Sequence, residues 1–260
     1  MTNHPAGTRV EVVGHGGAGD FYPGNSRESI EQALKIGVDR IEIDVQLSAD
    51  GDLVLVHDER LDISGRKTPI DEISTRQLRA LLPGFLTLPE AIELVAQRAP
   101  LLLDVKLPGY EPAVIHAIRD FDLASTAIVS STHLLVLHRL RRAFPGLRLG
   151  LSTGHMATGH RYALTRVVTA KVLQALTPLP LIQAARLVRA TDLMIQHRVC
   201  TPWLVRQAHA ADLKVYAWTV DRPRAIRRVQ QHGVDGIISN RPDLVWEVIR
   251  RDAALPVTSG

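Results

Sequence analysis

Short runs of β-branched and other apolar residues alternate along the chain with longer segments of helical periodicity. This is the pattern of a parallel sheet whose strands are joined by crossover helices. Segments such as "SRESIEQALKIG" and "TPWLVRQAHAADL" begin on Ser or Thr, which are preferred at the start of a helix. The runs predicted to be strands are residues 10–15, 40–46, 101–106, 126–131, 147–153, 192–197, 215–220 and 236–240. Eight such units without a linker predict an α/β fold, a single (β/α)8 TIM barrel forming one domain over residues 1–260.

The second run opens the segment "RIEIDVQLSADGDLVLVHD", in which apolar and polar residues alternate strictly up to position 48. Successive side chains of a strand point to opposite faces, so Glu42 and Asp44 share one face. On a buried strand two such carboxylates repel each other unless a cation lies between them. The Asp-Gly dipeptide at 50–51 favours a two-residue hairpin turn, and that register places His57 opposite Asp44. The segment therefore predicts a Glu42/Asp44/His57 cluster, with a solvent-facing edge hairpin as the alternative.

Polar residues also end other predicted strands, and the C-terminal ends of the strands form the active-site face of a TIM barrel. His15 ends the first strand and precedes "GGAG", whose small residues let the backbone approach a ligand. "LLLDVK" places Asp104 and Lys106 on one face of another strand. Two further strands end near Gln196 and Trp218. Each residue alone has an ordinary structural explanation, but all of them at one end of one barrel favour a functional site.

Composition narrows the classes of function. The chain has 260 residues, 45% apolar and 22% charged, which is enough for one large core. The net charge of +4 comes from arginines scattered among apolar residues, typical of solvated helix faces, so we expect no nucleic-acid partner. Cys200 is the only cysteine, and no apolar stretch has the length or flanks of a membrane span or signal peptide. We therefore expect a cytoplasmic protein without stable membrane insertion, while residues 154–189 and the oligomeric state receive no interpretation.

The motifs resemble those of the glycerophosphodiester phosphodiesterase superfamily over nearly the whole chain. The resemblance rests mainly on "GVDRIEIDVQLSADGDLVLVHD", supported by "GHGGAG", "PGNS", "LLLDVK", "VYAWTV" and "GVDGIISNRPD" in the family's order. It implies a TIM barrel that cleaves phosphodiesters with two histidines and a divalent metal, Mg²⁺ or Ca²⁺. Hard cations of this kind prefer oxygen ligands, and histidines near neutral pKa can move protons.

Carried over position by position, the resemblance implies a role for each candidate residue. The implied metal ligands are Glu42, Asp44 and Asp104. The implied acid and base are His15 and His57. The expected substrate contacts are Lys106 on the phosphate, Trp218 on the alcohol or lipid side, and Gly16 and Gln196.

The chain departs from the family pattern at three positions. Gly16 stands where the family has arginine, Gly24 where it has glutamate, and Asp104 where glutamate is common. The missing arginine removes a phosphate-binding fork. A non-arginine after the first histidine, together with Asp-x-Lys and "SNRP", is similar to the phospholipase D-like branch of the superfamily, although that branch is disulfide-bonded.

Three hypotheses about function follow, all with a small-molecule or lysolipid phosphodiester as ligand. The first is a metal-dependent hydrolase that cleaves a glycerophosphodiester to an alcohol and a phosphomonoester. The second is a phospholipase D-like enzyme that acts on lysophospholipids and releases cyclic phosphate. The third is a barrel that binds a phosphorylated ligand without turnover, and the presence of both histidines and all three acids argues against it.

Overall fold

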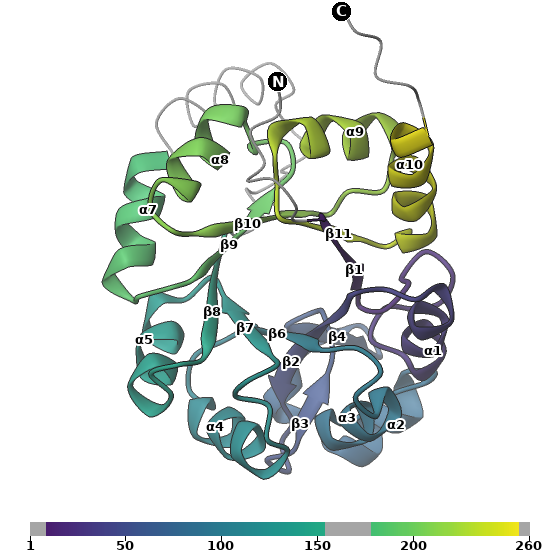
Figure 1. Ribbon diagram of the computed structural model, residues 1–260. Coiled ribbons are helices and arrows are strands. Elements are labelled where there is room, and N and C mark those ends of the chain that lie inside the picture. Colours follow the sequence, from purple (N-terminus) through teal and green to yellow (C-terminus); the bar gives the residue numbers. More distant parts are fainter. Residues whose placement is uncertain (1–8, 154–177, 255–260) are drawn as a thin grey trace, which may run out of the picture.

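A computed structural model describes residues 9–153 and 178–254. In this part of the chain, eight parallel strands form a closed barrel surrounded by helices (Figure 1). The order around the barrel is β1-β11-β10-β9-β8-β7-β6-β2, and β2 pairs with β1 to complete the ring. The predicted TIM barrel is therefore confirmed. One domain over residues 1–260 stays a prediction, and most of the uninterpreted segment, 154–177, lies outside the described residues.

The eight predicted strands are found within two residues of their expected ends. They are β1 (Glu11–His15), β2 (Arg40–Leu47), β6 (Leu101–Val105), β7 (Ile128–Ser131), β8 (Arg148–Ser152), β9 (Asp192–Gln196), β10 (Lys214–Trp218) and β11 (Gly236–Ser239). The helices described around them are α1 (Arg27–Ile36), α3 (Leu88–Val95), α4 (Glu111–Asp120), α5 (Leu134–Ala143), α7 (Pro178–Leu187), α8 (Pro202–His209), α9 (Pro223–His232) and α10 (Pro242–Ala254). Among the described residues, no helix is both long and apolar enough to span a bilayer.

A small subdomain is inserted between β2 and α3. Its elements are β3 (Leu53–Leu55), β4 (Arg60–Ile63), β5 (Arg66–Pro69), the 3-10 helix η1 (Ile70–Glu72) and α2 (Thr75–Leu81). It has its own apolar cluster, formed by Val54, Val56, Ile70, Ile73, Leu78 and Phe85. The cluster anchors the chain on either side of the loop that carries His57.

The β2–β3 hairpin differs from the predicted register by one residue. Val45 pairs with Leu55, so the ladder does not place His57 opposite Asp44, and that predicted pairing is wrong. The loop contains three residues, 49–51, and Gly51 has φ 86°. Glycine takes a positive φ in both the two-residue and the three-residue turn, so the Asp-Gly dipeptide is compatible with either.

The barrel interior is filled in layers. Its apolar middle is formed by Val13, Leu102, Ile128, Met194, Tyr216 and Ile238. Tyr216 fits because Gly236 lies beside its ring, where an added Cβ would come within 2.2 Å of Cδ1. The Tyr216 hydroxyl donates to Glu11 (2.9 Å) and accepts from Arg148 (3.1 Å) at the N-terminal ends of the strands. This network closes one end of the barrel, and polar side chains project at the other.

Candidate active site

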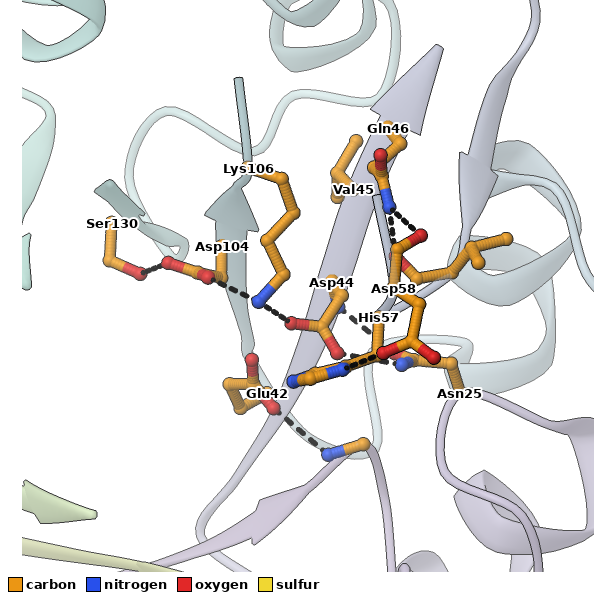
Figure 2. Close-up of polar contacts among 12 residues, drawn as sticks. Asn25, Glu42, Asp44, Val45, Gln46, His57, Asp58, Asp104, Lys106 and Ser130 are labelled. Carbon is orange, nitrogen blue, oxygen red and sulfur yellow. Dashed lines mark hydrogen bonds and ion pairs between the residues drawn. The ribbon is translucent and has the colours of Figure 1, made fainter. Parts of the chain in front are cut away.

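Three carboxylates converge at the C-terminal end of the barrel. Glu42 and Asp44 alternate along β2 with residues of the outer core. Asp104 lies beside Asp44 because β2 and β6 are parallel, with these two residues in register. One oxygen from each of the three side chains lies within 4.8 Å of the others (Figure 2). The structure thus brings together the three acids expected to be metal ligands.

The Lys106 ammonium lies between two of these acids. Its Nζ is 2.5 Å from Asp44 Oδ1 and 2.9 Å from Asp104 Oδ2. Burial lowers the pKa of Lys106, but the surrounding carboxylates outweigh it and raise the pKa. Burial likewise raises the pKa of Asp44, but the Lys106 ammonium outweighs it and lowers that pKa. Lys106 therefore compensates charge inside the acidic cluster, whereas the sequence predicts a contact with substrate phosphate.

Glu42 has the least compensation in the cluster. Its Oε2 accepts a hydrogen bond from Gly16 N (2.9 Å), and His15 Nε2 is 4.0 Å away. Burial, and then the charge of Asp44, raises the pKa of Glu42 to about 8. The positive charge of His15 and Lys106 is therefore too small to offset the burial of Glu42 and the charge of Asp44. Three converging carboxylates that need positive charge fit a hard divalent cation such as Mg²⁺ or Ca²⁺.

Asn25 holds Asp44 in place through two hydrogen bonds. Its Nδ2 donates to Asp44 Oδ2 (2.7 Å), and Asp44 N donates to Asn25 Oδ1 (2.9 Å). Asn25 is buried with φ 66°, and its own N donates to Gly16 O (2.9 Å). Sequence reasoning gave this residue no role, although it is the asparagine of "PGNS".

His15 is oriented by a hydrogen-bonded chain from the loop after β11. Its Nδ1 is 2.8 Å from Asn240 Oδ1, and Asn240 Nδ2 donates to Asp221 Oδ2 (3.0 Å). Because the Asn240 amide group donates to Asp221, its oxygen faces His15, so Nδ1 carries the hydrogen and Nε2 faces Glu42. Burial lowers the pKa of His15, but Glu42 and Asp44 outweigh it and raise the pKa. Asn240 and Asp221 were also missed from the sequence; "SNRPD" was the available signal for Asn240.

His57 reaches the site on the loop after β3. Its Nδ1 is 2.9 Å from Asp58 Oδ1. Gln46 is buried on β2, two residues after Asp44, and its Nε2 donates to Val56 O (2.8 Å) and Asp58 O (2.9 Å). These carbonyl groups flank His57, so Gln46 holds the backbone on both sides of it (Figure 2). The contact explains how His57 joins the site without the predicted cross-strand pairing.

Replacing Gln46 with leucine should lower turnover through His57. Leucine keeps much of the volume of the glutamine side chain but removes both hydrogen bonds to the loop. A small displacement of His57 can then lower kcat by about 10-fold or more. Steady-state kinetics of Gln46→Leu, His57→Ala and the double variant measure the coupling. If Gln46 acts by positioning His57, its substitution should add little in the His57→Ala background. Additive losses would assign Gln46 a separate role.

A cavity of about 520 Å³ opens over the cluster. The expected residues that line it are His15, His57, Glu42, Asp44, Asp104, Lys106 and Trp218. Two other expected substrate contacts are not among the described lining residues. Gln196 Oε1 accepts from Arg198 N (3.3 Å), and Gly16 is buried with its N bonded to Glu42. Ser130, which was not assigned a role, lines the cavity and donates to Asp104 Oδ1 (2.7 Å).

Comparison with known proteins identifies the family. The model described as "Glycerophosphoryl diester phosphodiesterase family" matches residues 15–244. The chain belongs to this family. Membership confirms the predicted superfamily and, with it, the predicted enzyme class, a phosphoric diester hydrolase.

Two curated relatives are similar over almost their whole length. The glycerophosphodiester phosphodiesterase of Caldanaerobacter subterraneus subsp. tengcongensis is 27% identical over 258 residues, covering 92% of this chain and 98% of the relative. That of Bacillus altitudinis is 28% identical over 254 residues, covering 90% and 96%. A crystal structure of a putative glycerophosphoryl diester phosphodiesterase from Silicibacter pomeroyi is 25% identical, with a TM-score of 0.78 and coverage of 96% and 95%.

The two glycines at which this chain departs from the pattern of the glycerophosphoryl diester phosphodiesterase family lie against each other. A Cβ added to Gly16 would lie 3.0 Å from both Asn25 N and Gly24 Cα. Gly16 also has φ 53°. Both departures therefore belong to one close backbone contact, beside the residues that hold Glu42 and Asp44.

Gly16→Arg should consequently impair this protein rather than restore a phosphate contact. The larger residue must displace Asn25 or the Gly16 amide, so we expect kcat/KM to fall by at least about 10-fold and unfolding free energy to fall by about 1–3 kcal/mol. Gly37→Arg is a matched control, since Gly37 has φ 80° and nothing within 4 Å of an added Cβ. Kinetics and thermal melts of both variants provide the comparison. Faster turnover by Gly16→Arg would contradict this account of the contact.

Proposed function

We propose that this chain hydrolyses glycerophosphodiesters to an alcohol and a phosphomonoester, using a divalent cation and the pair His15 and His57. The observation that carries the proposal is the convergence of three carboxylates within 4.8 Å in a cavity that both histidines line. A phosphodiesterase from Oleispira antarctica, 22% identical to this chain with a TM-score of 0.71, has been solved with the product sn-glycerol-3-phosphate. That product is a phosphomonoester of the kind proposed here.

Each group has a chemical task in the proposed reaction. Glu42, Asp44 and Asp104 would hold the cation, which supplies polarisation of the phosphoryl oxygen and neutralises developing charge. His15 presents Nε2 toward Glu42 and the cavity, while Asn240 fixes its tautomer. His15 and His57 can then remove a proton from the attacking water or hydroxyl and deliver one to the leaving alcohol.

The proposal also includes the identity of the cation, a substrate contact of Trp218 and a cytoplasmic location. Mg²⁺ and Ca²⁺ both suit a set of carboxylate oxygens. Trp218 lines the cavity and offers an apolar surface to the alcohol part of the substrate. A cytoplasmic location is favoured by the single cysteine, Cys200, which is buried and cannot form an intrachain disulfide.

Phosphorus NMR of the reaction products tests the proposed function. The purified protein is incubated with Mg²⁺ or Ca²⁺ and either glycerophosphocholine or a lysophospholipid. We expect the resonance of a phosphomonoester to appear from glycerophosphocholine. Accumulation of a cyclic phosphate from the lysophospholipid would instead favour the phospholipase D-like reaction, and no conversion of either substrate would favour a binding protein.

A further inference from the structure

Exposed apolar side chains gather at the mouth of the barrel, the end where the cavity opens. Eight large apolar side chains are exposed in the part of the chain that the structure describes. Four lie in the first turns of helices that begin at the mouth: Leu134 (39% exposed) and Leu135 (50%) on α5, Leu179 (56%) on α7 and Trp203 (37%) on α8. Single exposed apolar residues are ordinary, but a concentration of them around one opening indicates an interaction surface.

We call residues 132–135, 179–181, 197–203 and 219–224 the mouth arc. They lie at the starts of α5, α7, α8 and α9, after β7 to β10, which are consecutive strands of the barrel. Figure 1 shows these helices side by side around one half of the barrel. On the adjoining β1–α1 loop, Phe21 and Tyr22 are exposed at the same end, and Arg241 stacks over the Phe21 ring at 5.1 Å.

The mouth arc is cationic as well as apolar. Arg198, Arg222 and Arg224 are exposed on it. Its one acidic residue, Asp221, is half-buried and accepts a hydrogen bond from Asn240 N (2.8 Å). The helices also direct the positive ends of their dipoles toward the mouth.

The half of the barrel from β7 to α8, which carries most of the arc, is also basic in sequence. Residues 123–211 contain eleven arginine and lysine residues and one acidic residue, Asp192, which is buried in an ion pair with Arg148. The whole chain carries only +4, so the remainder is acidic overall. On the other side of the mouth, the inserted subdomain (residues 53–81) carries five acidic and five basic side chains and is neutral overall. An anionic surface would therefore attract the arc more strongly than the opposite side of the mouth.

We propose that the mouth arc docks on an anionic lipid surface, with the barrel mouth facing the lipid. Exposed leucine and tryptophan side chains can enter the headgroup region, while arginines contact anionic headgroups. A second copy of this chain is a poorer partner, because two cationic arcs would repel each other. Docking would also bring the cavity to phosphodiesters carried by the lipid surface, a consequence that rests on the proposed function.

Sedimentation with sucrose-loaded vesicles tests the proposal with matched variants. Vesicles of phosphatidylcholine with about 40 mol% phosphatidylglycerol supply the anionic surface, and pure phosphatidylcholine vesicles are the reference. The apolar variant is Leu134→Ser/Leu135→Ser/Trp203→Ser, and its control, Leu81→Ser/Leu187→Ser, removes exposed leucines outside the arc. The charge variant is Arg198→Gln/Arg222→Gln/Arg224→Gln. Its control is Arg142→Gln/Arg186→Gln/Arg189→Gln, at the far ends of α5 and α7. Thermal melts confirm that each variant is folded.

The wild-type protein should sediment with the anionic vesicles, bind the neutral ones far less, and dissociate at about 0.5 M salt. Both arc variants should bind at least about 10-fold more weakly, while the control variants should bind as the wild type does. His15→Ala should also bind normally, so that loss of turnover and loss of docking are separate results. Absent vesicle binding, equal binding to neutral vesicles, or equal loss in the controls would overturn the proposal.

Discussion

His15→Ala and His57→Ala should each lower kcat on a glycerophosphodiester by at least about 100-fold, the usual scale for a general acid or base. The two rings line the same cavity from separate elements, β1 and the loop after β3. Asn240 orients His15, and Gln46 holds the loop that carries His57. The two rings are therefore fixed in different positions, and neither can take over the task of the other. The loss should therefore appear in both variants.

The melting temperatures of the two variants distinguish a loss of catalysis from a loss of folding. His57 is exposed and His15 is half-buried, so we expect both melting temperatures to stay within a few degrees of the wild type. His116→Ala is a suitable control, since His116 lies on the exposed face of α4 in an ion pair with Asp120 (3.0 Å). Near wild-type turnover in either cavity variant would show that the ring in question does not carry a proton in the reaction.

Lys106→Met should make the stability of the fold depend on a divalent cation. Removing the ammonium leaves Asp44 and Asp104 without their ion-pair partner, and breaking a buried pair costs about 3–5 kcal/mol. In EDTA we therefore expect the melting temperature to fall by roughly 6–15 °C for a chain of this size. Mg²⁺ or Ca²⁺ should restore most of the loss, because a ligand that binds the folded state stabilises it by mass action.

Arg139→Met provides the matched comparison. Arg139 forms an ion pair of 3.0 Å with the buried Glu111, away from the three-carboxylate cluster. Its loss should destabilise the protein equally with and without divalent cation. Calorimetry of both variants in EDTA and in Mg²⁺ or Ca²⁺ makes the test. If the cation rescues neither variant, or both, the cluster is not a specific cation site.

The barrel could be predicted because its strands are short runs rich in apolar residues and are separated by segments of helical periodicity. β4 and β5 were missed because "RLDI" and "RKTP" are only four residues long and are partly exposed on the surface of the inserted subdomain. The hairpin register was wrong because Gly51 suits two kinds of turn, and sequence alone does not choose between them.

Within the site, the acids were predictable from alternation along a buried strand, while the groups that orient them were not. Asn25 and Asn240 lie in loops, where amide residues are common for many reasons. Gln46 lies on β2, but it acts through hydrogen bonds to the loop that carries His57. His57 lies in the cavity as predicted, but the predicted cross-strand pairing with Asp44 is wrong. Hydrogen bonds from Gln46 to the loop hold His57 there instead. The position of Lys106 inside the cluster depends on its long side chain folding back, which strand periodicity does not predict.

A crystal structure determined with Ca²⁺ would show whether the three carboxylates form a cation site. We expect one ion bound to an oxygen atom from each of Glu42, Asp44 and Asp104 at about 2.3–2.6 Å. The Lys106 ammonium should then leave its place between Asp44 and Asp104, because the divalent cation compensates their charge. An ion bound elsewhere, or a site in which Lys106 keeps both ion pairs at saturating Ca²⁺, would contradict the proposed cation site.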